Sequence, residues 1–228
     1  MQKSTSLFKQ KKIYFSALVA IFIFSICYLL INGKEAGFIS LSSYHPFWLN
    51  VFFINYTFMG NGIFAICLIG FVLFYFKRKK LGFGLLYAFF ISGIATQILK
   101  NLFNSSGPKL YFEAGTYLNF VDGVTVSGNS DFTSGHTATA FAIATVLVLL
   151  LKSKNLQLLI LMGAALVGYS RIYLAQHFLL DVIVGACLGS MSGIAAVYFA
   201  NNIIGLKWSF KKIHRLPVGE SPNAIQTA

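Results

Sequence analysis

The sequence is poor in charged residues, and acidic residues are the scarcest of them. Only 11% of its 228 residues are charged, with six Asp and Glu residues and eighteen Lys and Arg residues. Soluble domains carry about 25% charged residues, so the composition excludes an ordinary soluble domain. With 57% hydrophobic residues and a mean hydropathy of +0.72, the chain is predicted to be an integral membrane protein.

Cysteine is also scarce, and its placement excludes two further classes. Cys27, Cys67 and Cys187 lie inside apolar runs without paired spacing, which argues against a disulfide framework and against a cysteine metal site. The excess of basic residues does not indicate nucleic-acid binding, because these residues form short clusters beside apolar runs. We expect the lipid bilayer to be the partner of this chain, with no nucleic acid and no obligate protein partner.

Long apolar runs predict an all-α integral membrane protein, a bundle of six transmembrane helices in one domain. The first run is too long for a signal peptide and no clear cleavage site follows it, so it is counted as a span. The expected spans are about residues 13–31, within 48–76, 81–102, 134–151, 156–173 and 178–204. The bundle therefore occupies residues 1–206, and residues 207–228 form a basic and then polar tail.

The basic residues predict the orientation of the chain in the membrane. Fourteen of the eighteen precede span one, lie between spans two and three or four and five, or follow span six. By the positive-inside rule this side is the cytoplasm. We expect a multi-pass protein of the cell (cytoplasmic) membrane with both termini cytoplasmic. In the long outer loop, Asp-Gly between β-branched residues at 120–126 is compatible with a small hairpin or a plain loop.

The stretch from Ser170 to Asp181 places charged side chains between two apolar runs, where charge is costly. Arg171, His177 and Asp181 are therefore functional candidates. His177 and Asp181 are four residues apart and would share one face of a helix. A carboxylate on one imidazole nitrogen fixes the tautomer and leaves the other nitrogen free as a base or nucleophile. The structural alternative is a His–Asp pair that only stabilises the bundle.

Two more polar clusters are expected on the same outer side: Lys100 at the end of span three, and Ser134-Gly135-His136 at the start of span four. Thr133 or Ser134 can cap that helix, whose free N–H groups favour an anion. Lys100 and Arg171 add fixed positive charge that suits a phosphate. One histidine can attack phosphorus while the other protonates the leaving oxygen. Taken singly, each feature also has a structural explanation as a cap, a snorkelling lysine or an interfacial anchor.

These residues and their order resemble the type-2 phosphatidic acid phosphatase superfamily of membrane lipid-phosphate phosphatases. The pattern of that family has three parts: Lys, six residues, Arg-Pro; then Pro-Ser-Gly-His; then Ser-Arg, five residues, His, three residues, Asp. The third part is complete here, and the second is present with Thr133 in place of Pro. The resemblance covers about residues 50–205.

The resemblance implies a role for each matching position. His177 would be the nucleophile that forms a phosphohistidine, Asp181 would orient it, and His136 would be the acid for the leaving group. The phosphate would be held by Lys100, Ser134, Gly135 and Arg171. The family needs no metal and no cofactor. The substrate would be a lipid phosphate or pyrophosphate such as phosphatidic acid, phosphatidylglycerol phosphate, undecaprenyl pyrophosphate or a lipid A phosphate, cleaved on the extracytoplasmic face.

The first part of the pattern departs from the family, because Gly107 occupies the position of its Arg. Three explanations follow. Lys109 supplies a substitute charge, the substrate makes its own contact there, or the protein is slow or inactive.

Other functions also remain open. They are phosphoryl transfer between lipids, and phospholipid binding or transport without cleavage. A metal hydrolase using His136, His177 and Asp181 as ligands is disfavoured by the neighbouring cations. A rhomboid-type protease is disfavoured because Phe132 replaces the first Gly of its Gly-x-Ser-Gly motif.

Overall fold

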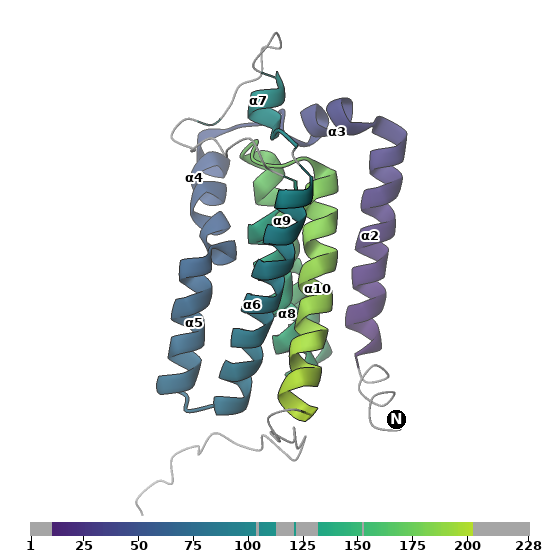
Figure 1. Ribbon diagram of the computed structural model, residues 1–228. Helices are drawn as coiled ribbons and strands as arrows, with labels where there is room; N and C mark the ends of the chain where they lie inside the picture. Colours follow the sequence, from purple (N-terminus) through teal and green to yellow (C-terminus); the bar gives the residue numbers. More distant parts are fainter. Residues whose placement is uncertain (1–10, 104, 113–120, 122–131, 152, 203–228) are drawn as a thin grey trace, which may run out of the picture.

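The computed structural model describes residues 11–103, 105–112, 121, 132–151 and 153–202, and every regular element within these ranges is a helix (Figure 1). The elements are α2 (Lys12–Asn32), α3 (Lys34–Leu41), α4 (Phe47–Tyr56), the 3₁₀ turn η1 (Thr57–Gly60), α5 (Gly62–Phe74), α6 (Lys79–Leu102), α7 (Pro108–Phe112), α8 (Gly135–Leu150), α9 (Lys154–Tyr173) and α10 (Leu179–Asn202). The predicted all-α class is confirmed for this part of the chain.

Four of these helices are long and apolar enough to cross a bilayer: α2, α6, α9 and α10. The segments Phe47–Gly60 and Gly62–Phe74 make a fifth if they count as one span, although its axis bends by 57°. α8 has sixteen residues and falls below the length of a typical span. By length and composition up to five spans are supported, and the sixth stays a prediction.

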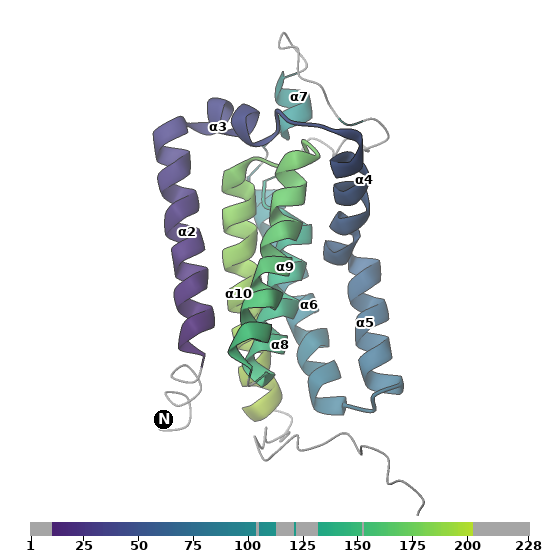
Figure 2. The same ribbon diagram turned by 180° about the vertical axis from the view of Figure 1, so that it is seen from behind.

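α8 is the central helix of the bundle. Nearly all of its side chains are buried, because α10, α6, α9 and η1 pack around it (Figures 1 and 2). Its sequence, GHTATAFAIATVLVLL, is apolar on every side, as expected for a helix enclosed by other helices. Because neighbouring helices cover it, α8 does not need the length of a helix that faces lipid.

The contact between α8 and α10 depends on three glycines spaced four residues apart on α10. A Cβ on Gly185 would lie 2.7 Å from the Ser134 carbonyl oxygen, and one on Gly193 would lie 2.8 Å from that of Ala142. A Cβ on Gly189 would overlap the carbonyl oxygen of Ala138. Small residues at this spacing let two backbones approach closely, which is the usual way membrane helices pack. The spacing therefore fixes α10 against α8.

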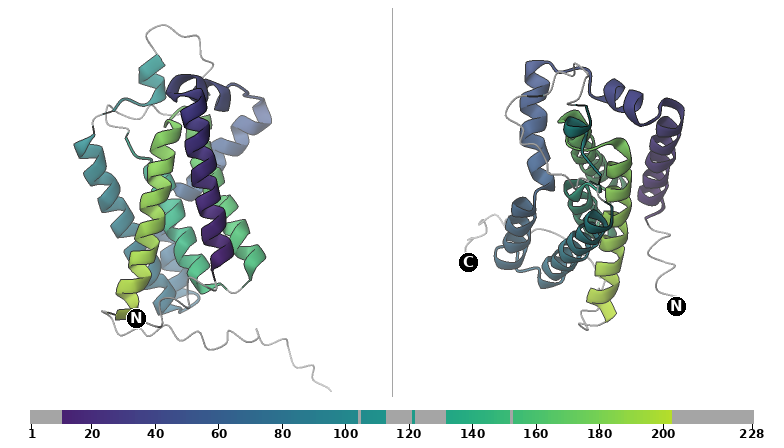
Figure 3. Two further views of the ribbon diagram at one scale, coloured as in Figure 1. Left: turned by 90° about the vertical axis from the view of Figure 1, so that its right-hand side faces the viewer. Right: turned by 45° about the horizontal axis from the view of Figure 1, so that its top comes forward.

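Two short helices, α3 and α7, lie at one end of the bundle (Figures 1 and 3). α3 follows α2 directly, and Gly33 between them has a φ of 73°, a conformation that glycine adopts readily. Residues 33–46 contain α3, and residues 103–133, the long outer loop, contain α7. The hairpin considered for residues 120–126, apart from Val121, and the tail 207–228 lie outside the described residues.

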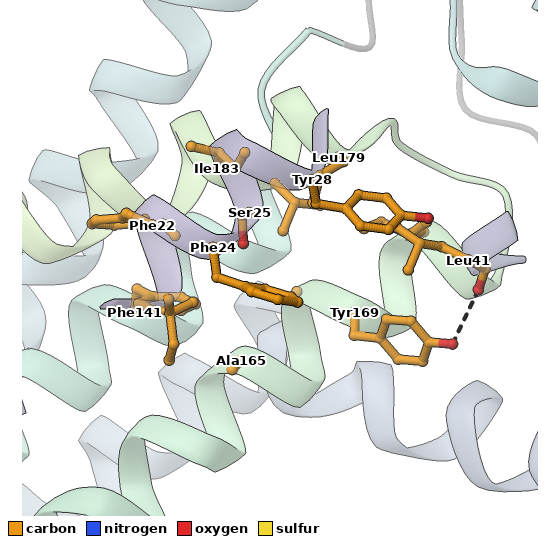
Figure 4. Close-up of a pocket in the computed structure, with 15 residues that line it drawn as sticks. Phe22, Phe24, Ser25, Tyr28, Leu41, Phe141, Ala165, Tyr169, Leu179 and Ile183 are labelled. Atoms are coloured by element: carbon orange, nitrogen blue, oxygen red, sulfur yellow. Dashed lines mark hydrogen bonds between the residues drawn. The ribbon is translucent and has the colours of Figure 1, made fainter. Parts of the chain in front are cut away.

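An apolar cavity of about 300 Å³ separates part of α2 from α9 and α10 (Figure 4). Phe22 of α2, Phe141 of α8, Ala165 and Tyr169 of α9 and Ile183 of α10 are among its lining residues. The Tyr169 hydroxyl at its edge donates a hydrogen bond of 3.0 Å to the Leu41 carbonyl. None of the polar residues singled out in the sequence lines this cavity.

The close approach of α8 and α10 generates a stability prediction. Gly189→Ala places a methyl group against the Ala138 carbonyl and 2.9 Å from Phe141 Cβ, so the helices must separate. We expect a loss of about 1–3 kcal/mol in the free energy of unfolding, measured as a lower melting temperature in detergent. Gly93→Ala on α6 is the matched control, since nothing lies within 4 Å of its Cβ position. Equal melting temperatures for the two variants would contradict the tight packing.

Candidate active site

The first cluster lies at the start of α8, where Ser134 is the N-cap. The Ser134 hydroxyl accepts hydrogen bonds from the Thr137 N–H at 3.3 Å and from the Thr137 hydroxyl at 2.8 Å. Gly135 and His136 are the first two residues of the helix. His136 is half-buried, whereas Ser134 is fully buried. The backbone N–H groups of this first turn therefore lie next to the imidazole.

Thr133 precedes this cap in an unusual backbone conformation. Its φ is 75°, in the left-handed region that a β-branched residue rarely adopts. A proline could not adopt it, because its ring holds φ near −65°. The replacement of the family's Pro by Thr is thus accompanied by a backbone turn that excludes Pro. Strain of this kind is found mostly at functional sites.

The second cluster begins at the last turn of α9 with Arg171, which is only 7% exposed. Its Nη1 donates a hydrogen bond of 2.8 Å to the hydroxyl oxygen of Thr57 in η1. Its Nη2 donates one of 3.2 Å to Oε1 of Gln176. Both acceptors are neutral oxygens, so they orient the guanidinium without cancelling its charge.

His177 lies in the short connection from α9 to α10 and is buried. The backbone N–H groups of Gln176 and His177 both donate to the Arg171 carbonyl, at 2.9 and 3.1 Å. This turn passes through Ala175, whose φ is 54°. His177 Nδ1 lies 3.8 Å from Oδ2 of Asp181, within range of a charge interaction but beyond a hydrogen bond.

The His177–Asp181 pair differs from the expectation in one respect. α10 begins at Leu179, so His177 precedes the helix instead of lying on it. The two side chains still meet, because Asp181 turns back toward the helix start. Its Oδ2 accepts a hydrogen bond of 2.9 Å from the Phe178 N–H. The carboxylate therefore caps α10 and faces His177 at once.

The two clusters are joined directly. The Ser134 N–H donates a hydrogen bond of 3.2 Å to the Asp181 carbonyl, which connects the start of α8 to the start of α10. His136 has the ionisable side chains of Arg171, His177 and Lys100 as neighbours, and His177 has those of Asp181, Arg171 and Lys100. Lys100 reaches this group from the last turn of α6. Residues predicted from three separate helices are thus brought together.

Lys109 and Gly107 belong to the segment around α7. Lys109 is partly buried within this five-residue helix, and Gly107 is buried just before it. α7 lies at the same end of the bundle as the polar cluster (Figure 1). The Gly107 carbonyl accepts a hydrogen bond of 3.0 Å from the Tyr111 N–H, which starts the helix.

α3 and α7 form a cap over the His177 loop that the sequence did not predict. The Tyr111 hydroxyl donates a 2.5 Å hydrogen bond to a carboxylate oxygen of Glu35. Lys34 Nζ lies 4.6 Å from the ring centre of Tyr111 and 4.1 Å from that of Phe178. Phe178 directly follows His177, so these contacts hold the loop from above. No motif marks these residues in the sequence.

The sequence motifs also did not identify Thr57 and Gln176 as residues of the candidate site. Thr57 lies in a largely apolar run whose few polar residues form no recognised motif, and Gln176 falls in the unspecified gap of the Ser-Arg…His…Asp pattern. Only their contacts with Arg171 identify them. Within the described ranges, no group of three or more His, Cys, Asp or Glu side chains is placed to hold a metal ion.

Comparison with known proteins places this arrangement in a family. The family model of the PAP2 superfamily matches residues 81–204. A crystal structure of Aquifex aeolicus LpxE is 31% identical, covers 72% of this chain and 94% of its own, and superposes with a TM-score of 0.63. The crystal structure of a transmembrane PAP2-type phosphatidylglycerolphosphate phosphatase from Bacillus subtilis shares the fold, with a TM-score of 0.59 at 23% identity, over 82% of this chain and 96% of its own.

Two curated relatives are similar in sequence. An undecaprenyl-diphosphatase from Sulfolobus acidocaldarius is 29% identical over 194 residues, which is 82% of this chain and 91% of the relative. A lipid A 4'-phosphatase from Bacteroides thetaiotaomicron is 30% identical over 76 residues, 33% of this chain. The match spans only about a third (34%) of that relative.

The fold and the family model define a membrane-embedded helical protein of the PAP2 kind. The chain belongs to the PAP2 superfamily. The predicted relationship to the type-2 phosphatidic acid phosphatases is therefore confirmed.

The surroundings of His177 favour its neutral form. Burial lowers its pKa from the ordinary value of 6.5, and the nearby Arg171 and Lys100 add to this, while Asp181 opposes them. At pH values between the pKa of the folded state and that of the unfolded state, the unfolded chain binds a proton at this histidine and the folded chain does not. The contribution of the buried neutral His177 to the free energy of unfolding is complete above about pH 6.5 and is lost as the pH falls below that value.

This pKa can be measured directly by NMR titration of ¹³C-labelled histidine, with His177→Gln to assign the resonance. We expect a pKa below 6.5, and a still lower one in Asp181→Asn, because the carboxylate that favours the charged imidazole is gone. Asn retains an oxygen for the Phe178 N–H, so the helix start is preserved. A wild-type pKa above 6.5, or one raised by Asp181→Asn, would contradict this account.

Proposed function

We propose that this protein is a membrane lipid phosphatase that hydrolyses a phosphate or pyrophosphate monoester of a lipid. The observation that carries the proposal is the meeting of His136, His177, Arg171 and Lys100 at one end of a bundle of apolar helices. Two histidines and two fixed cations suit the binding and transfer of a phosphoryl group. A site at the end of such helices suits a substrate whose tails stay in the bilayer.

In the proposed mechanism, His177 is the nucleophile. Its Nδ1 faces Asp181, so Nε2 attacks phosphorus while the bond from phosphorus to the lipid oxygen breaks. His136 gives a proton to that oxygen, and a phosphohistidine forms on His177. Water then attacks phosphorus with His136 as base, the N–P bond breaks, and inorganic phosphate leaves.

The remaining polar groups would hold the phosphate. Arg171 and Lys100 supply positive charge, and Ser134 with Gly135 supplies the N-terminus of α8, where N–H groups and the helix dipole favour an anion. Lys109 is the proposed source of charge in place of the family's arginine. We propose that no metal or cofactor takes part.

The relatives support a lipid substrate without selecting one. Their names include an undecaprenyl-diphosphatase and a lipid A 4'-phosphatase. A polyprenyl diphosphate, a lipid A phosphate, phosphatidic acid and phosphatidylglycerol phosphate all present a terminal phosphate at headgroup level. Assay of the four lipids in parallel distinguishes them.

We also propose that the site faces the extracytoplasmic side, with α8 as a short sixth span of the domain 1–206. The basic residues support this orientation. Lys77 and Arg78 lie between α5 and α6, and Lys79 and Lys80 begin α6, at the end of the bundle opposite α3 and α7 (Figure 1). The positive-inside rule assigns that end to the cytoplasm.

The first test is phosphate release from the four lipids in detergent, with and without EDTA. We expect release from at least one lipid, and its loss in His177→Ala because no nucleophile remains. EDTA should leave the rate unchanged. His45→Ala is the matched control, since this histidine packs against Tyr173 at 4.5 Å and is not a charged neighbour of either site histidine. Equal rates for His177→Ala and wild type would exclude the proposed nucleophile, and loss of release in EDTA would exclude a metal-free reaction.

A second test concerns Gly107. If the missing guanidinium only weakens phosphate binding, Gly107→Arg should raise kcat/KM by roughly tenfold to a hundredfold, the worth of a charged hydrogen bond of about 1.5–3 kcal/mol. Gly107→Gln controls for the bulk of a long side chain at this buried position. An unchanged or lower kcat/KM would show that Gly107 does not merely weaken the site.

The same experiment examines Lys109. If it substitutes for the arginine, Lys109→Ala should lower kcat/KM in the wild-type background and lower it less when Gly107→Arg is present. Independent effects in the two backgrounds would argue against substitution.

A further inference from the structure

The span formed by α4 and α5 is broken at the level of the candidate site. α4 ends at Tyr56, η1 covers Thr57–Gly60, and Asn61 caps α5 by accepting a 2.8 Å hydrogen bond from the Ile63 N–H. The axis bends by 57° across this break (Figure 1). η1 packs against both α8 and α9, the helices that carry His136 and Arg171.

The two ends of η1 each contact one of these residues. Thr57 accepts the 2.8 Å hydrogen bond from Arg171 Nη1. Gly60 is buried against His136: a Cβ there would lie 2.8 Å from the His136 carbonyl oxygen and 2.9 Å from its Cβ. In a 3₁₀ turn residues i and i+3 lie directly in line, so the turn presents Thr57 and Gly60 on one side.

The chemistry of the contact suits an orienting role. A threonine hydroxyl binds the guanidinium as a neutral acceptor, so this contact orients Arg171 without itself neutralising the positive charge. The bond fixes one edge of the planar group, and Gln176 holds a second nitrogen at 3.2 Å. Orientation matters for arginine because its paired donors bind phosphate only in a defined plane.

From this geometry we propose that Thr57 is a positioning residue for the phosphate-binding site, acting through Arg171. The inference rests on the proposed function, because it concerns the same phosphate. Thr57 lies outside the family pattern in the sequence and outside the matched residues 81–204. Since Gly107 replaces the other arginine of that pattern, the orientation of Arg171 carries more of the phosphate binding here.

The test compares Thr57→Val, which keeps the shape and removes the hydroxyl, with Thr57→Ser, which keeps the hydroxyl. Orthovanadate serves as the phosphate analogue, and its dissociation constant is measured by thermal shift without turnover. We expect Thr57→Val to weaken vanadate binding about tenfold or more and to raise KM for the lipid by a similar factor. Thr57→Ser should stay within about threefold of wild type, because the acceptor remains.

Two controls separate positioning from a structural role. Thr145→Val makes the same chemical change in the buried core of α8, where Thr145 bonds to Tyr14 at 2.8 Å, and should leave vanadate affinity unchanged. In an Arg171→Lys background, Thr57→Val should have little further effect, because the guanidinium it orients is gone.

The outcomes distinguish this inference from the proposed function. Equal vanadate affinity in wild type and Thr57→Val, or independent effects in the Arg171→Lys background, would overturn the role of Thr57. Thr57-dependent vanadate binding without release of phosphate from any lipid would support the positioning role and overturn the proposed hydrolysis.

Discussion

The arrangement of the site depends on how closely α8 and α10 approach. Gly185 leaves room for the Ser134 carbonyl, and on the same turn the Ser134 N–H reaches the Asp181 carbonyl at 3.2 Å. This backbone contact sets the start of one helix against the start of the other. Because His136 and His177 lie beside those two starts, the distance between the histidines follows from packing of backbones and does not depend on long flexible side chains.

A second constraint is the cost of placing charge within a bundle of apolar helices. Arg171 is almost completely buried, and its guanidinium donates hydrogen bonds to side-chain oxygens of Thr57 and Gln176. Hydrogen bonds of this kind offset part of the desolvation cost, and neutral acceptors do so without neutralising the guanidinium themselves. The electrostatic attraction between Arg171 and a bound anion is then stronger than at a solvated arginine, because charge interactions strengthen as water is excluded.

The sequence was sufficient for the parts of the molecule that follow from pattern. The apolar runs predicted the helices. The spacing of the polar motifs predicted the cluster that the structure brings together, formed by Ser134, His136, Arg171, His177 and Asp181. It was insufficient where a contact joins segments without a motif. Thr57 lies in a largely apolar run without a recognised motif, and the break beside it packs against α8 and α9. The Lys34, Tyr111 and Phe178 contacts likewise exist only once α3 and α7 lie over the loop.

The shortness of α8 sets the depth of the site. At 1.5 Å per residue its sixteen residues span about 24 Å, less than the roughly 30 Å of a bilayer core. A central helix of this length cannot reach both faces of the bilayer core. In the proposed site His136, in the first turn of α8, is half-buried and would bind the phosphate in a recess at the end of the bundle. In such a recess a phosphate loses part of its hydration shell, which is replaced by interactions with fixed cations and backbone N–H groups. Selection for a terminal phosphate would then come from how far a headgroup extends into the recess.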